Sequence, residues 1–152
     1  MSINEEEYKQ LRRSAFNMLA RRDHSVDELK KKLLKRSDDI ELVNAVVNAL
    51  IADRYLDDAR LTELLTQAKY RQGLGPERIK RLLQSKALSY DDVYNAFNES
   101  EWRVGLAMTW SKRFTEKPKD NKSYTQQARY LQYRGFSLEQ INRFLREKHE
   151  QQ

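Results

Sequence analysis

Apolar residues recur four positions apart in three stretches of the chain, and each stretch begins with a residue that can start a helix. The stretches are "HSVDELKKKLLKR" at 24–36, "LGPERIKRLLQSK" at 74–86 and "FSLEQINRFLREK" at 136–148. Alignment superposes Ser25, Gly75 and Ser137, then Leu29, Ile79 and Ile141, then Leu33, Leu83 and Leu145. This spacing predicts three amphipathic helices that bury equivalent faces.

The residues around these helix starts have capping chemistry. Ser25 with Glu28, and Ser137 with Gln140, have the spacing of a capping box, while Pro76 follows Gly75 at the first helical position. Three acidic pairs, Asp38 and Asp39, Asp57 and Asp58, and Asp91 and Asp92, are interpreted as further helix starts rather than as general acids and bases.

Each amphipathic helix follows another helix and a turn of two or three residues, which gives three helix–turn–helix units. The segments 38–54, 88–100 and 100–114 also have helical patterns, with Ser89 and Asp92 as the predicted cap of the second, and no segment has a strand pattern. The prediction is an all-α fold of about nine helices, arranged as an elongated tandem array of three three-helix repeats. The expected units are 1–54, 55–99 and 100–152, with a linker at 115–122.

Composition supports a helical protein and narrows its setting. Charged residues make up 34% of the chain, with only 4 glycines, 2 prolines and no cysteine. The amino-terminal segment "MSINEEEYKQ" is polar and acidic, and the longest nearly apolar run, "VNAVVNALIA", is too short to span a bilayer. We therefore expect a soluble, cytoplasmic monomer without a membrane partner.

The sequence offers little catalytic chemistry. No glycine-rich nucleotide loop is present, and "GLGP" at 73–76 is interpreted as a helix start in preference to a phosphate cradle. His24 and His149 are the only histidines and lie far apart, so His24 is interpreted as a turn residue rather than a metal ligand. We expect no enzymatic activity, no catalytic residue, no metal site and no cofactor.

Positive charge is concentrated in the last third of the chain. The net charge is +6, and the excess is +1 in residues 1–50, zero in 51–100 and +5 in 101–152. Such a surface attracts nucleic acid or an acidic protein groove, although a solvated face is the simpler interpretation of any single lysine. The candidate partner-binding residues are Arg21, Arg22, Lys31, Lys32, Lys69, Tyr70, Arg71, Lys80, Arg81, Arg129, Tyr130, Arg134, Arg143 and Arg146. Tyr130 fits the core equally well.

Three runs in this order, "RRDHSVDELKKKLLKR", "YLDDARLTELLTQAKYRQGLGPERIKRLLQSK" and "RYLQYRGFSLEQI", resemble the bacterial RecX regulatory family over nearly the whole chain. The resemblance implies a modulator that binds the RecA nucleoprotein filament and lowers its assembly, ATPase, strand-exchange and coprotease activities. Weak contact with the single- or double-stranded DNA of the filament is compatible with this role.

The alternative is a stand-alone nucleic-acid-binding protein without sequence preference, which would use the helix–turn–helix units directly. A dedicated sequence reader presents Arg, Asn or Gln at the start of a recognition helix. Here the second position after each alignment point is acidic, as Asp27, Glu77 and Glu139. This pattern favours the filament regulator over a reader of DNA sequence.

Overall fold

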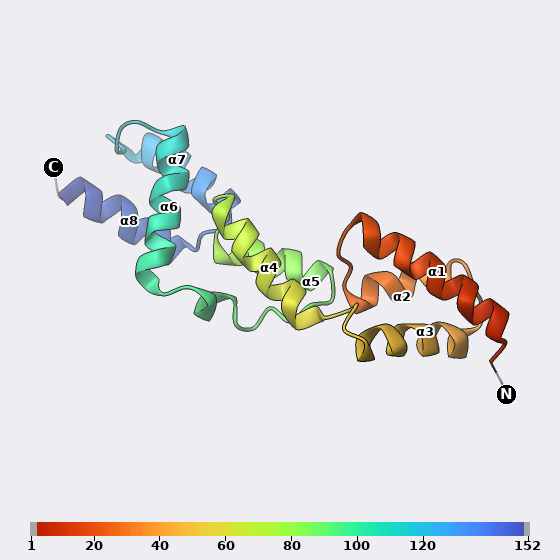
Figure 1. Ribbon diagram of the computed structural model, residues 1–152. Helices are drawn as coiled ribbons and strands as arrows, with labels where there is room; N and C mark the ends of the chain where they lie inside the picture. Colours follow the sequence, from red (N-terminus) through yellow and green to blue (C-terminus); the bar gives the residue numbers. More distant parts are fainter. Residues whose placement is uncertain (1–2, 151–152) are drawn as a thin grey trace. The chain divides into compact units, whose positions relative to one another are not determined.

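The computed structural model describes residues 3–150, and all regular secondary structure within that range is helical (Figure 1). The α-helices are α1 (Glu5–Arg21), α2 (Val26–Leu34), α3 (Ile40–Ala52), α4 (Asp58–Arg71), α5 (Pro76–Ser85), α6 (Glu99–Arg113), α7 (Asn121–Tyr133) and α8 (Leu138–Glu150), with one 3₁₀ helix, η1 (Val93–Ala96). The predicted all-α fold is confirmed. None of the described helices is both long enough and apolar enough to cross a bilayer.

Helix starts follow the predicted capping chemistry. The Ser25 side chain accepts from the Glu28 amide, and the Glu28 carboxylate accepts from the Ser25 amide. Ser137 and Gln140 make the same reciprocal pair at the start of α8. Asp39 accepts from the Leu42 amide at the start of α3. These bonds satisfy amides that have no partner inside their own helices.

The prediction of an α-helix in residues 88–100 is wrong. Only the four residues of η1 are helical, and the Asp92 side chain makes no capping hydrogen bond. The reason lies in the residues that follow: Phe97 is extended, and Asn98 forms a capping box with Glu101 that starts α6. The predicted start at Ser89 and Asp92 therefore has too few residues before the next helix begins.

The described chain divides into two compact units. The first comprises the described residues up to Glu63 together with Ser85–Leu88, and the second comprises Leu64–Gln84 together with the described residues from Ser89 onward. The division into three repeats at 54 and 99 stays a prediction. Helices α1, α2 and α3 pack together in the first unit around Leu11, Ala15, Leu29, Leu33, Leu42, Val43, Val46, Val47, Leu50 and Leu56.

The core of the second unit contains a row of aromatic side chains. Tyr70 of α4 stacks on Phe97 with ring centroids 4.0 Å apart, and the edge of Trp102 packs against Phe97. Further along α6, the buried Lys117 ammonium lies 4.2 Å from the Trp110 ring centroid and 3.7 Å from that of Phe144. Cation–π attraction thereby fixes the linker before α7 against α6 and α8.

The predicted apolar stripes are buried as expected. Leu33 and Leu83 are 0% exposed and Leu145 is 1% exposed, and Leu29, Ile79 and Ile141 are 0% exposed. The aligned apolar positions are thus buried to the same extent in the structure. Because this stripe faces inward, the charged residues between its members face solvent.

Two turns of the second unit meet backbone to backbone. The Gly75 amide donates to the Arg134 carbonyl at 2.9 Å, and the Glu77 amide donates to the Gly135 carbonyl at 2.8 Å. A Cβ on Gly75 would lie 2.5 Å from the Gly135 carbonyl carbon. Gly135 has φ +107, and its own Cβ would lie 2.3 Å from the Arg78 Cβ. Residues of the third repeat therefore cap helix α5 of the second.

Candidate functional site

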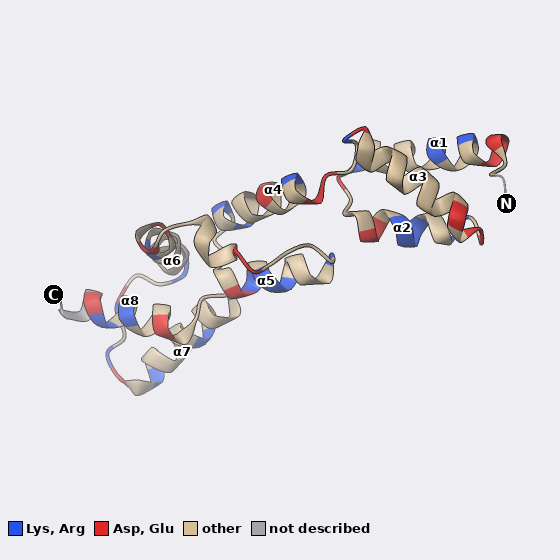
Figure 2. Cartoon of the chain, turned by 90° about the horizontal axis from the view of Figure 1, so that it is seen from below, with Lys and Arg blue, Asp and Glu red and all other residues tan. Residues whose placement is uncertain are grey.

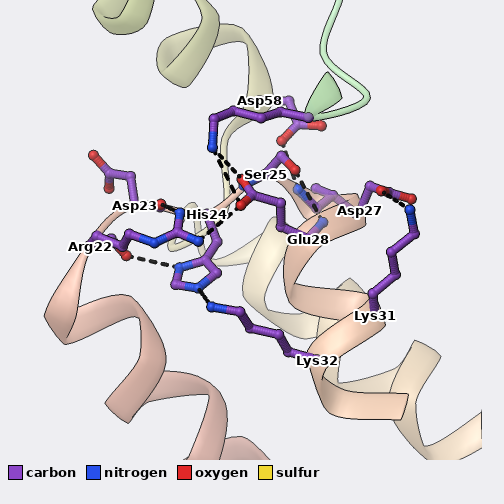
Figure 3. A network of polar contacts seen from close by, with 11 residues as sticks. Arg22, Asp23, His24, Ser25, Asp27, Glu28, Lys31, Lys32 and Asp58 are labelled. Carbon is purple, nitrogen blue, oxygen red and sulfur yellow. Dashed lines mark hydrogen bonds and ion pairs between the residues drawn. The ribbon is translucent and has the colours of Figure 1, made fainter. Parts of the chain in front are cut away.

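Three of the predicted partner-binding residues, Arg22, Lys31 and Lys32, lie near the turn between α1 and α2 (Figure 3). Arg22 pairs with Glu28 at 3.0 Å, and Lys86 pairs with the same carboxylate at 3.5 Å. Lys31 pairs with Asp27 at 3.0 Å along α2. The predicted partner-binding residues Arg22 and Lys31 therefore form ion pairs within their own unit, whereas Arg21 at the end of α1 is exposed.

His24 lies in this turn, as predicted, but its side chain is buried. Its Nδ1 lies 2.9 Å from the Arg22 carbonyl, and its Nε2 lies 2.7 Å from the Lys32 ammonium. An ammonium is only a donor, so Nε2 accepts and Nδ1 carries the proton. Lys32 thus holds the imidazole in its neutral form.

Asp58, which follows the predicted first repeat in the sequence, also contacts the start of α2. The Val26 amide, at the first position of α2, donates to Asp58 Oδ1 at 2.9 Å. Asp58 is the first residue of α4, where Asp57 accepts from the Arg60 amide at 3.1 Å. The Asp57 and Asp58 pair therefore caps two helices, which supports capping over catalysis.

The network shifts two pKa values in a direction that affects stability. Burial lowers the pKa of His24 from its ordinary 6.5, and the Lys32 and Arg22 charges act in the same direction against the hydrogen bond to the Arg22 carbonyl. Burial alone would raise the pKa of Glu28, but the Ser25 amide, Arg22 and Lys86 outweigh it and lower this pKa from 4.5 to about 2.

We expect unfolding experiments to show the His24 effect below neutral pH. As pH falls below 6.5 the unfolded chain binds a proton at His24 that the native protein resists, so stability falls with pH. His24→Gln, which can keep both hydrogen bonds, should lose less stability between pH 7.5 and 5.5 in urea denaturation. Equal losses in the wild type and the variant would contradict this assignment. The Glu28 contribution is lost only as pH falls from 4.5 toward 2 in both proteins.

Some of the predicted partner-binding residues in the second repeat form contacts within the protein, and others are exposed. Tyr70 is part of the aromatic core and donates its hydroxyl to the Glu101 carbonyl, so it does not present a free ring. Lys69 donates to Gln72, and the Lys80 ammonium lies 4.9 Å from the Tyr94 ring centroid. Arg71 and Arg81 are exposed.

The predicted partner-binding residues of the third repeat also differ in their contacts. Two of its arginines, predicted as outward charges, form polar contacts within the protein. Arg134 donates to the Gln72 carbonyl at 2.7 Å and is half-buried. Arg143 pairs with Glu99 and, at 3.4 Å, with Glu139. Tyr130 is half-buried against Phe114 and under the Arg113 guanidinium. Arg129 and Arg146 are exposed.

Five candidate bases keep their charge available to a partner. They are exposed and form no ion pair with any side chain that the structure describes, and they are Arg21, Arg71, Arg81, Arg129 and Arg146. Figure 2 shows basic segments on helices of both units. Unpaired guanidiniums attract phosphate or carboxylate groups more strongly than paired ones, because no neighbouring charge neutralises them.

The glycine segment at 73–76 does not form a phosphate cradle. The Gly75 and Glu77 amides, which would have to bind the phosphate, already donate to the Arg134 and Gly135 carbonyls. The interpretation of Gly75 and Pro76 as a helix start is thus confirmed, since α5 begins at Pro76. Among the residues that the structure describes, no three His, Asp or Glu side chains gather as a metal-binding group would require.

Several of these contacts join residues far apart in the sequence and could not be predicted from it. The Glu28–Lys86 pair and the Val26–Asp58 bond join positions 58 and 32 residues apart. The capping spacing of Ser25 and Glu28 indicated only the local part of this network. Acid and base residues separated by such distances carry no sequence signal of their pairing.

Comparison with known proteins places these features in a family. A family model described as "RecX, third three-helix domain" matches residues 106–145. The regulatory protein RecX of Ectopseudomonas mendocina (strain ymp) is 37% identical over 139 residues, covering 90% of this chain and 93% of that protein. The chain belongs to the RecX family of regulatory proteins. A second RecX relative, from Pseudomonas entomophila (strain L48), is 37% identical over 138 residues and covers 89% of both chains.

RecX proteins of known structure share the fold. RecX from Lactobacillus salivarius has a TM-score of 0.83 at 17% identity, with 95% of this chain and 97% of that chain covered. Another structure, titled as the regulatory protein RecX, has a TM-score of 0.76 at 16% identity, with 95% and 80% covered. The resemblance seen in the sequence is therefore confirmed, and a regulatory role follows from the family.

Proposed function

We propose that this RecX family chain is a non-enzymatic regulator that acts in the cytoplasm as a monomer and binds the RecA nucleoprotein filament. Binding inhibits filament assembly, ATPase, strand exchange and coprotease activity. The observation that carries the proposal is the extent of the family relationship: relatives named regulatory protein RecX align along about 90% of the chain.

The five exposed, unpaired arginines are the groups that we expect to contact the filament. A nucleoprotein filament presents phosphates and acidic side chains along its length, and unpaired guanidiniums bind either group. Arg21 lies in the first unit, while Arg71, Arg81, Arg129 and Arg146 lie in the second. Each unit therefore offers at least one exposed guanidinium to the filament.

The helix starts support the filament regulator over a stand-alone reader of DNA sequence. A recognition helix usually directs its first residues toward base edges. Here, Glu77 and Glu139 lie in the first turns of α5 and α8, and carbonyls of the Arg134–Gly135 turn already cover the start of α5. Carboxylates at these positions repel the phosphates that flank either groove.

The experiment compares two charge reversals of equal size. The test variant carries Arg71→Glu and Arg129→Glu, which replace exposed, unpaired bases. The control carries Lys31→Glu and Lys119→Glu, which replace bases that already pair with Asp27 and Glu116. Both variants should keep the helical circular-dichroism spectrum, since exposed substitutions change stability by about 0.5 kcal/mol or less.

The test variant should lose inhibition of RecA ATPase on single-stranded DNA by about tenfold or more in midpoint concentration at low salt. The difference from the wild type should shrink as the salt concentration rises, because screening weakens the contacts that the wild type makes. The control should inhibit within about threefold of the wild type. Binding to naked oligonucleotide and to preassembled filament is measured at two salt concentrations. Equal or tighter binding to naked DNA, with inhibition explained by competition for the strand, would establish the nucleic-acid binder instead.

A further inference from the structure

A cavity of about 370 Å³ opens on the second unit between η1, α6 and α8. Its floor is formed by Trp102, Leu106 and Phe144, all of which are buried. This volume is within the range of pockets that bind small groups, and an apolar floor gains free energy when an apolar group covers it. The proposed function makes no use of this pocket.

The ring faces around the pocket are already occupied by cations of the protein itself. The Lys80 ammonium lies over the Tyr94 ring, and the Lys117 ammonium lies 3.7 Å from the Phe144 centroid on the linker side. The pocket therefore does not offer an open aromatic cage for a free cation. It offers a hydrophobic recess that suits an uncharged side chain.

The rim of this pocket is charged, and its two most exposed charged groups are the carboxylates of Glu99 and Glu139. Arg143 lies between Glu99 and Glu139, and Arg103 pairs with Glu147 at 3.6 Å. Glu99 and Glu139 are 70% and 83% exposed, whereas the Arg143 side chain that they neutralise is 47% exposed. A ligand that approaches the recess thus meets carboxylates first. The rim thus has three carboxylates and two guanidiniums, which favours a cationic ligand over nucleic acid here, although the last third of the chain is basic overall.

We propose that this pocket, which we call the α6–α8 pocket, anchors a large apolar side chain of a partner protein whose neighbouring residue is lysine or arginine. The apolar side chain covers Leu106 and Trp102, and the base lies against Glu99 and Glu139. Protein interfaces concentrate their binding free energy in recesses of this kind, where a central apolar anchor is surrounded by a polar rim. The inference rests on the proposed function only in that the partner is a protein.

The two tryptophans provide a reporter and an internal reference. Trp102 lines the α6–α8 pocket and donates its indole N–H to the Tyr94 carbonyl, whereas Trp110 lies outside the lining and donates to Gln127. Acetyl-Leu-Arg-amide is titrated into the full-length protein while the indole ¹⁵N–¹H signals are recorded, with assignment from Trp110→Phe. The Trp102 signal should shift and saturate in the millimolar range, and the Trp110 signal should move much less.

Peptide chemistry and one matched pair of variants test specificity. Acetyl-Leu-Glu-amide and acetyl-Gly-Arg-amide should each bind at least about threefold more weakly than acetyl-Leu-Arg-amide. Glu139→Gln should weaken acetyl-Leu-Arg-amide about two- to fivefold. Glu116→Gln should not, although Glu116 is also 70% exposed and paired with a nearby base.

Two results would overturn the assignment. One is a Trp102 signal that does not move with any of the peptides. The other is equal affinity for the arginine and glutamate peptides, which would show that the rim charges take no part. Because these titrations contain no recombinase, their outcome is separate from that of the ATPase test.

Discussion

Gly135→Ala is expected to lower the free energy of unfolding by roughly 3–5 kcal/mol. Gly135 has φ +107, a backbone conformation that side-chain-bearing residues adopt only with strain. An alanine Cβ would also lie 2.3 Å from the Arg78 Cβ and 2.7 Å from the Arg78 amide nitrogen. Because α5 backbone cannot move aside without breaking the Glu77–Gly135 bond, strain and lost capping act together.

Gly105→Ala is the matched control for this substitution. Gly105 lies within α6 with ordinary helical geometry, and its Cβ would meet only the edge of the Tyr70 ring at 3.1 Å. Alanine favours the helix by about 1 kcal/mol, which offsets this contact, so the net change should stay within about 1 kcal/mol. Urea unfolding followed by circular dichroism gives both values. Similar losses of unfolding free energy at Gly105 and Gly135 would show that the contact of Gly135 with the α5 backbone does not contribute more to stability than an ordinary helix position.

Leu33→Ala, Leu83→Ala and Leu145→Ala should each cost about 2–5 kcal/mol, as large-to-small changes at buried positions do. The exposed Leu64 and Leu138, 47% and 54% accessible, serve as controls, and their alanine variants should change stability by about 0.5 kcal/mol. The substitutions are at aligned positions, so the three losses should be similar in size.

Amide hydrogen exchange distinguishes which unit each substitution weakens. Leu33 lies in the first unit, and Leu83 and Leu145 lie in the second. Leu33→Ala should therefore speed exchange in α1–α3 most, and Leu145→Ala should speed exchange in α6–α8 most. A near-zero loss at all three positions would contradict the equivalence of the repeats.

The local features of the fold were predictable from the sequence, because each depends on residues within one or two helical turns. The i, i+4 apolar spacing of Leu29 and Leu33 identified the buried face, and the Ser25–Glu28 spacing identified a helix start. The wrong prediction of an α-helix that starts near Asp92 has the same physical basis. A competing local signal, the capping box of Asn98, lay a few residues further on and determined where the helix began.

Features of the candidate site were less predictable, because they depend on contacts between distant segments. Helical spacing placed Arg143 outward, as observed, but could not show that Glu99, 44 residues away, neutralises it. Arg134 likewise donates to the Gln72 carbonyl 62 residues away. A list of basic residues from the sequence therefore overstates the charge that a partner meets. The unpaired subset emerges only when every guanidinium has been placed beside its neighbours.

The caps on α5 also determine when this part of the chain can complete its structure during synthesis. The first unit requires nothing beyond Leu88, so its contacts are available once that residue has left the ribosome. The Gly75 and Glu77 amides, in contrast, have to wait for the carbonyls of Arg134 and Gly135, about 60 residues later. Until the turn at 134–135 emerges, the start of α5 stays open to water, and the second unit closes only when almost all of the chain has been made.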